Sequence, residues 1–259
     1  MSYETILVSK EDGIATVTLN RPPMNPLSSA VWSELGKAAE EFNKDPEVKV
    51  MIITGNGTKA FAAGADVSEM ATLTPVGVFD FCQTSKVAMQ KIENMIKPVI
   101  AAIPGVAFGG GCELALSADF RIAGDNAKFA FPEVGLGIIP GGGGTQRLSR
   151  LVGQCKAKEL MFIGDIIDAA TAEKIGLVNK VVPIDSLMDE ARAMAKKLAS
   201  KPLVATQMCK AAINASANVD LNAGLDFEQQ CFVMAFASAD GKEGISAFVE
   251  KRKPKYTDK

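Results

Sequence analysis

Residues 107–120, AFGGGCELALSADF, set three consecutive glycines directly before Cys112 and Glu113. Glycine lets another molecule approach the main chain closely, and the first turn of a helix presents unpaired N–H groups. The residues around Glu113 are mostly small or apolar. The stretch therefore predicts a place where backbone donors meet a negatively charged group beside a carboxylate.

The size and charge of the chain narrow its class. Its 259 residues, 47% of them hydrophobic, suit one large domain or one domain with an appendage. The 28 Lys and Arg nearly balance the 30 Asp and Glu, so nothing points to a nucleic-acid partner. No apolar run approaches the ~20 residues of a membrane span, and the first residues lack the features of a signal peptide. Five scattered cysteines without a C-x-x-C pair indicate reduced thiols and a cytoplasmic location.

The chain contains no histidine. This excludes Ser-His-Asp and Cys-His catalysis as well as H-E-x-x-H zinc chemistry, and no metal site is expected. Neither a P-loop nor a dinucleotide fingerprint is present. The glycines at 141–144 precede a helix, but without a lysine they are weak evidence for phosphate binding. Acid–base chemistry must then come from carboxylates, Lys, Tyr, Cys or the backbone.

Hydrophobic periodicity predicts an α/β fold followed by a helical C-terminal region. Alternating apolar residues indicate a strand at 13–22, and a helix with a serine N-cap begins at Ser28. Further strands are predicted at 48–55, 98–103, 176–182 and, as two short ones, within 120–131. Further helices are predicted at 76–97, 145–153, 185–201, 204–220 and 223–238.

Two more segments combine a bare backbone or an apolar setting with a carboxylate. In FAAGADVSEM, residues 61–70, Asp66 to Glu69 also forms a D-x-x-E capping box. Glu133 follows Pro132 at a turn or helix start, and Glu113 lies where the helix dipole favours an acid. Each feature has a structural explanation by itself. Their recurrence within about 70 residues favours a functional site.

Five motifs, in order, resemble the crotonase superfamily: RPxxN from Arg21, FAAGAD, GGGCE, PEVGLGIIPGGGGTQRL and the ending SAFVEKRKPKY. The chain is similar over essentially its whole length to short-chain enoyl-CoA hydratases and 3-hydroxybutyryl-CoA dehydratases. The resemblance implies an α/β fold, a crotonase-like spiral of ββα units. Residues 1–200 would form the core with the coenzyme A and catalytic sites. Residues 201–259 would form a helical region for trimerisation and pocket closure.

The resemblance also implies a reaction, the reversible syn addition of water across the C2=C3 bond of a 2-enoyl-CoA thioester. No cofactor is implied, because coenzyme A is part of the substrate. By motif, the N–H groups of Ala65 and Gly110 bind the thioester oxygen as it becomes an enolate. Glu113 deprotonates the water and Glu133 protonates the α-carbon. Because the two acids titrate as a coupled pair, the resemblance specifies which two residues form the pair more firmly than which role each one has. Isomerisation of the double bond, or hydration of a cyclic or dienoyl substrate, remains the alternative.

Coenzyme A contacts carry over from the same motifs. The resemblance implies contacts with Ala63, Ala65, Asp66, Val67, Ser68 and Gly110. Phe248 and Lys251 match positions that close the nucleotide pocket, often from a neighbouring subunit, although EKRK is equally an ordinary basic end. A homotrimer or a hexamer of two trimers is implied, with no nucleic-acid or membrane partner.

Some residues depart from the family pattern. Asn25-Pro26 replaces the common Asn-Ala, and Pro104-Gly105 replaces Asn-Gly. Phe131 stands where many hydratases have Gln, and an aromatic ring there would make the pocket more apolar and suit a cyclic or dienoyl acyl group. Two other classes of protein are disfavoured. The acidic pI of about 5.4 argues against an RNA-binding relative, and the missing fingerprint argues against an NAD-linked oxidoreductase.

Overall fold

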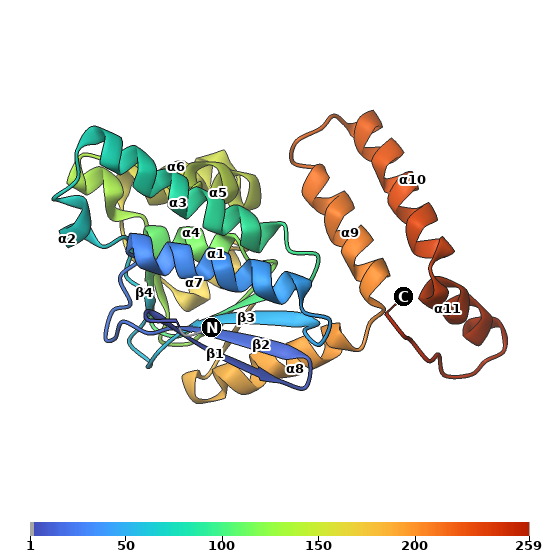
Figure 1. Ribbon diagram of the computed structural model, residues 1–259. Helices are drawn as coiled ribbons and strands as arrows, with labels where there is room; N and C mark the ends of the chain where they lie inside the picture. Colours follow the sequence, from blue (N-terminus) through green and yellow to red (C-terminus); the bar gives the residue numbers. More distant parts are fainter. Residues whose placement is uncertain (1–2, 259) are drawn as a thin grey trace.

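A six-stranded sheet in the order β1-β2-β3-β5-β7-β10 forms the centre of the core in the computed structural model, which describes residues 3–258 (Figure 1). Its strands are β1 (Ile6–Glu11), β2 (Ile14–Leu19), β3 (Val50–Gly55), β5 (Val99–Ile103), β7 (Phe120–Gly124) and β10 (Lys180–Val182). The β1–β2 hairpin is antiparallel, and all other neighbours run parallel. Strands β3 and β5 are buried along their whole length, as parallel strands covered on both faces must be.

Helices cover both faces of this sheet. On one face lie α1 (Ser29–Lys44) and α3 (Pro75–Glu93), and on the other lies α8 (Leu187–Ala199) (Figure 1). Because side chains alternate along a strand, β3 divides its residues between the two layers. Met51 and Ile53 belong to the cluster under α1, whereas Ile52 packs into the cluster that contains α8.

A second sheet, ordered β4-β6-β8-β9, lies beside the first. Its strands are β4 (Ala60–Ala62), β6 (Val106–Phe108), β8 (Lys128–Ala130) and β9 (Ile167–Asp168). Each of β3, β5 and β7 continues into β4, β6 or β8 and then into a helix, so the chain repeats a ββα unit three times. This confirms the spiral expected from the sequence motifs. Since β4, β6 and β8 are parallel, the segments that follow them meet at one edge.

Shorter helices complete the core. They are α2 (Val67–Met70), α4 (Gly110–Leu116), the 3-10 helix η1 (Pro132–Leu136), α5 (Gly144–Val152), α6 (Gln154–Ile163), α7 (Ala169–Lys174) and the 3-10 helix η2 (Ile184–Ser186). The helix predicted to reach Lys97 ends at Glu93 instead. The Asn94 N–H closes its last turn, and the Lys97 ammonium is buried, where it donates to the Phe42 carbonyl of α1 at 2.7 Å. Residues 94–97 thus do not extend α3. Asn94 caps its C-terminus, and Lys97 binds a carbonyl near the end of α1.

The last three helices form a projection that we call the C-terminal arm, residues 203–258 (Figure 1). It contains α9 (Leu203–Ala215), α10 (Leu221–Ala237) and α11 (Ala239–Val249). Lys210 of α9 ties the arm to the core, because its ammonium contacts a carboxylate oxygen of Asp119 at 2.7 Å and the Lys97 carbonyl at 3.2 Å. No helix between residues 3 and 258 is long and apolar enough to cross a bilayer.

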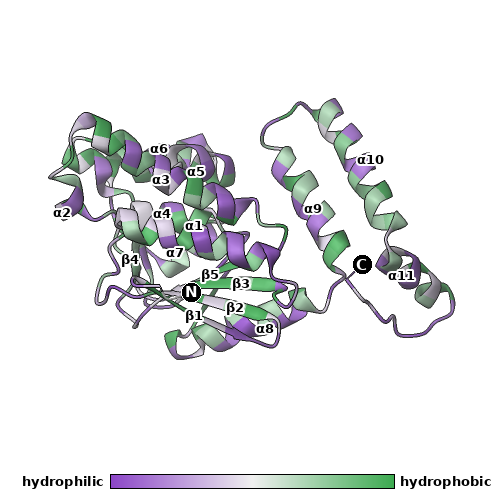
Figure 2. Ribbon diagram, viewed as in Figure 1, coloured by the Kyte–Doolittle hydropathy of each residue, from purple (hydrophilic) through white to green (hydrophobic). Residues whose placement is uncertain are grey.

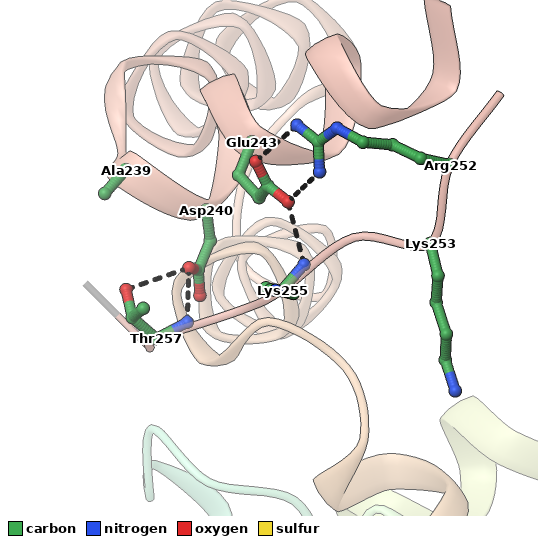
Figure 3. Close-up of a pocket in the computed structure, with 7 residues that line it drawn as sticks. All are labelled: Ala239, Asp240, Glu243, Arg252, Lys253, Lys255 and Thr257. Atoms are coloured by element: carbon green, nitrogen blue, oxygen red, sulfur yellow. Dashed lines mark hydrogen bonds and ion pairs between the residues drawn. The ribbon is translucent and has the colours of Figure 1, made fainter. Parts of the chain in front are cut away.

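The end of the chain folds back along α11 and forms with it an open, shallow cavity of about 620 Å³ (Figure 3). Glu243 pairs with Arg252 at 2.6 Å, and both oxygens of Asp240 accept backbone N–H groups, from Thr257 and Asp258. The carboxylates around this cavity are therefore already partnered. They hold the end of the arm in place, far from the segments that follow β4, β6 and β8.

Candidate active site

The segments that follow β4, β6 and β8 come into contact where their strands end. A Cβ atom built at Gly110 would lie 3.4 Å from the nitrogen of Ala65. One built at Gly109 would lie 2.5 Å from Oε1 of Glu133. Gly109 also has φ 47°, a conformation that L side chains rarely adopt. The approach to Glu133 requires glycine at position 109, whereas at position 110 a Cβ atom would make an ordinary contact.

Glu113 lies in the first turn of α4 and is 4% exposed. Its Oε1 accepts hydrogen bonds from the N–H groups of Gly142 and Gly144, both at 2.8 Å. A Cβ at Gly142 would lie 2.7 Å from the carboxylate, so this approach also requires glycine. Burial raises the pKa of Glu113, while the two donors act in the opposite direction by stabilising its ionised form.

Glu133 is in the first turn of η1, and its surroundings contrast with those of Glu113. Its Oε2 is buried and has no hydrogen-bond partner among the described residues. Burial, together with the charge of Glu113, raises the pKa of Glu133 to about 7. This carboxyl can therefore hold a proton near neutral pH. The two glutamates form a pair in which one is supported as an anion and the other can hold a proton.

Two backbone N–H groups lie beside these carboxyls. Leu27 and Ala65 form a single parallel bridge, in which the Leu27 N–H donates to Gly64 at 2.9 Å and the Leu27 carbonyl accepts from Asp66 at 3.0 Å. These bonds use the residues on either side of Ala65, so the Ala65 N–H points away from Leu27. Neither this group nor the Gly110 N–H donates to an acceptor within the described part of the chain. The structure thus brings together all four residues predicted as catalytic.

The predicted coenzyme A turn, residues 63–68, leads from this site into α2. Asp66 caps α2 by accepting from the Glu69 N–H at 3.3 Å. Only this half of the expected capping box forms, because Oε2 of Glu69 accepts instead from the Ser29 N–H of α1 at 3.0 Å. The guanidinium of Arg21 lies 2.9 Å from Oδ2 of Asp66 and holds the pKa of that carboxyl below its usual range.

The two other predicted coenzyme A residues lie elsewhere in the same chain. Phe248, 85% exposed, is in α11, and Lys251 follows that helix. Figure 1 shows α11 at the end of the molecule opposite α2. One chain therefore does not bring Phe248 and Lys251 to the turn at residues 63–68.

Three other residues that shape the site were not predicted for it. In the sequence, the glycine run at 141–144 is weak evidence for phosphate binding. In the structure, the N–H groups of Gly142 and Gly144 donate to Glu113. Arg147 holds this run by donating to the Gly142 carbonyl at 2.9 Å and pairing with Glu93 at 2.7 Å. The available signal was the position of the glycines, shortly after Glu133 and directly before a helix.

Phe131 differs from its expected role. Its side chain is 1% exposed, and its ring would lie 3.0 Å from a Cβ atom at Gly144. The ring therefore supports the glycine that donates to Glu113, and it does not line an open pocket in this structure. The expectation of a more apolar pocket surface at this position is wrong.

Comparisons with known proteins agree with the fold and the site. A family model described as "Enoyl-CoA hydratase/isomerase" matches residues 9–259. A crotonyl-CoA hydratase from Syntrophomonas wolfei is 46% identical over 260 residues, covering 100% of both chains. A short-chain-enoyl-CoA hydratase from Clostridium acetobutylicum is 45% identical and covers 98% of this chain and 97% of its own.

A solved structure extends the similarity to the whole backbone. The crystal structure of an enoyl-CoA hydratase from Bacillus anthracis matches with a TM-score of 0.95 and 41% identity, over 99% of this chain and 100% of that one. The match includes the C-terminal arm as well as the two sheets. The chain belongs to the enoyl-CoA hydratase/isomerase family, within the crotonase superfamily that its motifs resemble.

Proposed function

We propose that this protein is an enoyl-CoA hydratase, which adds water reversibly and syn across the C2=C3 bond of a 2-enoyl-CoA thioester in acyl-CoA metabolism. The observation that carries the proposal is the pairing of two buried carboxyls in contrasting environments with two free N–H groups. Glu113 is supported as an anion by two donors, whereas Glu133 has an oxygen without a partner among the described residues and a pKa of about 7.

The proposed reaction uses these groups in one sequence. The N–H groups of Ala65 and Gly110 bind the thioester oxygen and stabilise the negative charge that develops there. Glu113 accepts a proton from water as the water oxygen bonds to C3 and the π electrons move toward the thioester. Glu133 then donates a proton to C2, and the carbonyl re-forms. Proton exchange between the two carboxyls restores the starting state.

The substrate brings the only coenzyme that the proposal requires. Addition of water to an activated double bond leaves the overall oxidation state unchanged, so no redox cofactor takes part, and the two N–H groups polarise the carbonyl without a metal. We place the adenine end of coenzyme A at the turn formed by residues 63–68. Phe248 and Lys251 would close the nucleotide pocket from a neighbouring subunit, because within one chain they lie on the distant arm.

The test of this function is a panel of CoA thioesters in ¹⁸O-water, followed by mass spectrometry. We expect crotonyl-CoA to gain one water with the label at the C3 hydroxyl, and loss of conjugation gives an optical signal. Movement of a double bond between carbons can be achieved with one base, whereas holding and splitting water suits two carboxyls. Rapid conversion of a 3-enoyl thioester without label uptake by crotonyl- or dienoyl-CoA would establish an isomerase instead.

The C-terminal arm supports assembly into a homotrimer or a hexamer of two trimers. Figure 2 shows hydrophobic residues along α9 and α10, on helices that project from the core. The large apolar residues exposed on α10 are Leu221, Leu225, Phe227, Phe232, Val233, Met234 and Phe236. Such a surface on a soluble chain marks an interaction site, and a closed symmetric assembly buries it on every copy.

Sedimentation at micromolar concentration tests the assembly. We expect a species of three or six times the 27.3-kDa chain mass, because burying several large apolar side chains stabilises association by ~1.5–3 kcal/mol each. A monomer under these conditions would contradict the proposal. We also place the protein in the cytoplasm, since its five cysteines are free thiols, as in a reducing compartment.

A further inference from the structure

Arg21 joins the two segments that present the Ala65 N–H. It lies two residues after the end of β2, and its side chain is one-third exposed. The same nitrogen, Nη1, donates to the carbonyl of Pro26 at 2.8 Å and contacts Oδ2 of Asp66 at 2.9 Å. Pro26 immediately precedes Leu27, and Asp66 immediately follows Ala65. One guanidinium therefore connects both partners of the Leu27–Ala65 bridge.

The bridge needs this support because it contains a single residue pair. On one side of it, Ala63 donates to the Met24 carbonyl at 2.9 Å. Buried Asn25 fixes the same end, since its amide donates to Ala60 of β4 at 3.0 Å and its carbonyl accepts from the Arg21 N–H at 3.1 Å. Beyond Ala65, the cross-connections are the Asp66–Leu27 hydrogen bond, the Arg21–Asp66 ion pair and, further along both segments, the hydrogen bond from the Ser29 N–H to Glu69.

The direction of the Ala65 N–H depends on this bridge. In a parallel pairing, Leu27 bonds to the residues on either side of Ala65, so the plane of the Gly64–Ala65 peptide is set by how residues 64–66 lie along residues 26–27. Rotation of this peptide would turn the N–H away from the oxygen it has to bind. Oxyanion stabilisation depends on donors that are already aligned, and a misplacement of about 1 Å can reduce a rate about 10²-fold.

We propose that Arg21 is a positioning residue for the thioester-binding N–H of Ala65, acting through its simultaneous contacts with Asp66 and Pro26. This inference rests on the proposed function, because it assumes that the Ala65 N–H binds the carbonyl oxygen of the substrate. It assigns Arg21 no contact with the reacting atoms. The Arg21–Asp66 ion pair holds residues 64–66, which carry the Ala65 N–H, in the orientation that the transition state requires.

The test compares Arg21→Met, Arg21→Lys and Asp66→Asn with the wild-type chain. Asn keeps an oxygen that can accept from the Glu69 N–H and so retains the cap of α2, while it removes the charge. We expect Arg21→Met and Asp66→Asn to lower kcat for crotonyl-CoA hydration about 10- to 100-fold. For Arg21→Met, KM should change less than about threefold. Arg21→Lys should recover part of kcat. The double variant, Arg21→Met with Asp66→Asn, should have a kcat no lower than that of the less active single variant.

A spectroscopic signal separates positioning from a general loss of structure. Binding of cinnamoyl-CoA to the wild type should shift its absorption to longer wavelength, because aligned donors polarise the conjugated carbonyl. The shift should shrink in Arg21→Met and Asp66→Asn. Lys10→Met is the matched control: it removes the Lys10–Asp45 ion pair at 2.8 Å, elsewhere on the surface, and should leave kcat and the shift unchanged.

Two failures can be told apart. If the wild type hydrates crotonyl-CoA and shifts the probe, but Arg21→Met retains full kcat and the full shift, the inference about Arg21 is wrong and the proposed function stands. A raised KM with unchanged kcat and shift would likewise overturn it, by placing Arg21 at the coenzyme A phosphates. If the wild type neither hydrates crotonyl-CoA nor shifts the probe, the proposed function falls and the inference falls with it.

Discussion

Replacement of Glu113 or Glu133 by glutamine is expected to lower kcat for crotonyl-CoA hydration by roughly 10²–10⁴ in each case, the usual contribution of a positioned acid or base. Glutamine has nearly the same shape but neither gains nor releases the proton. At position 113 its side-chain oxygen can still accept from the Gly142 and Gly144 N–H groups, so the local structure should persist. At position 133 the variant removes the carboxyl whose pKa is raised to about 7.

The pH dependence distinguishes the two variants. Glu133 has to be protonated to deliver a proton to C2, so hydration by the wild type should decline as the pH rises through about 7. That decline should disappear from the residual activity of Glu133→Gln and remain in that of Glu113→Gln. Circular dichroism and thermal melting control for folding. Near-wild-type turnover by either folded variant would remove that residue from the mechanism.

Gly110→Pro is expected to reduce kcat by roughly 10²–10³, the effect of losing one oxyanion donor. Gly110 is the first residue of α4, and proline is tolerated at that helical position while its nitrogen carries no hydrogen. Binding of the coenzyme A portion should suffer less, because the nucleotide contacts are proposed at residues 63–68 and on the arm. Single-turnover kinetics and the affinity for CoA separate the two effects.

Gly110→Ala is the matched control for the proline variant. It keeps the N–H and adds a Cβ atom 3.4 Å from the Ala65 nitrogen and 3.6 Å from the Leu27 side chain, distances of ordinary contact. Its loss of kcat should therefore be smaller than that of Gly110→Pro. A folded proline variant with full activity would show that the bare backbone before Glu113 does not bind the thioester.

The sequence was sufficient for most of the long elements and for the order of the motifs. The helix with its Ser28 cap, the buried strands β3 and β5, and the helices α8, α9 and α10 all lie close to where periodicity put them. The short strands β4, β6 and β9 were missed, and so were β1, α6, α7 and α11. Strands of two or three residues have too few side chains to show an alternation of apolar and polar residues. Their position depends on pairing with strands that are distant in the sequence.

Recognition of the site was uneven for a similar reason. Glu113 and Glu133 could be predicted because they are carboxyls in apolar surroundings, and Gly110 because it lies in a run of three glycines. The contributions of Gly142, Gly144 and the Arg21–Asp66 pair depend on which groups face each other across 29 to 45 residues of chain. No spacing rule contains that information. The three-dimensional arrangement shows that this glycine run supports an acid.

The threefold ββα repeat separates the tasks of this enzyme among units that can vary independently. One repeat contains Ala65, the next supplies Gly110 and Glu113, and the third supplies Glu133. In the proposed reaction, the thioester oxygen is held by backbone, which side-chain substitution hardly alters, while the reaction that follows depends on individual side chains. A lineage with this architecture can exchange one acid and acquire a different reaction on the same activated ester, without rebuilding how that ester is recognised.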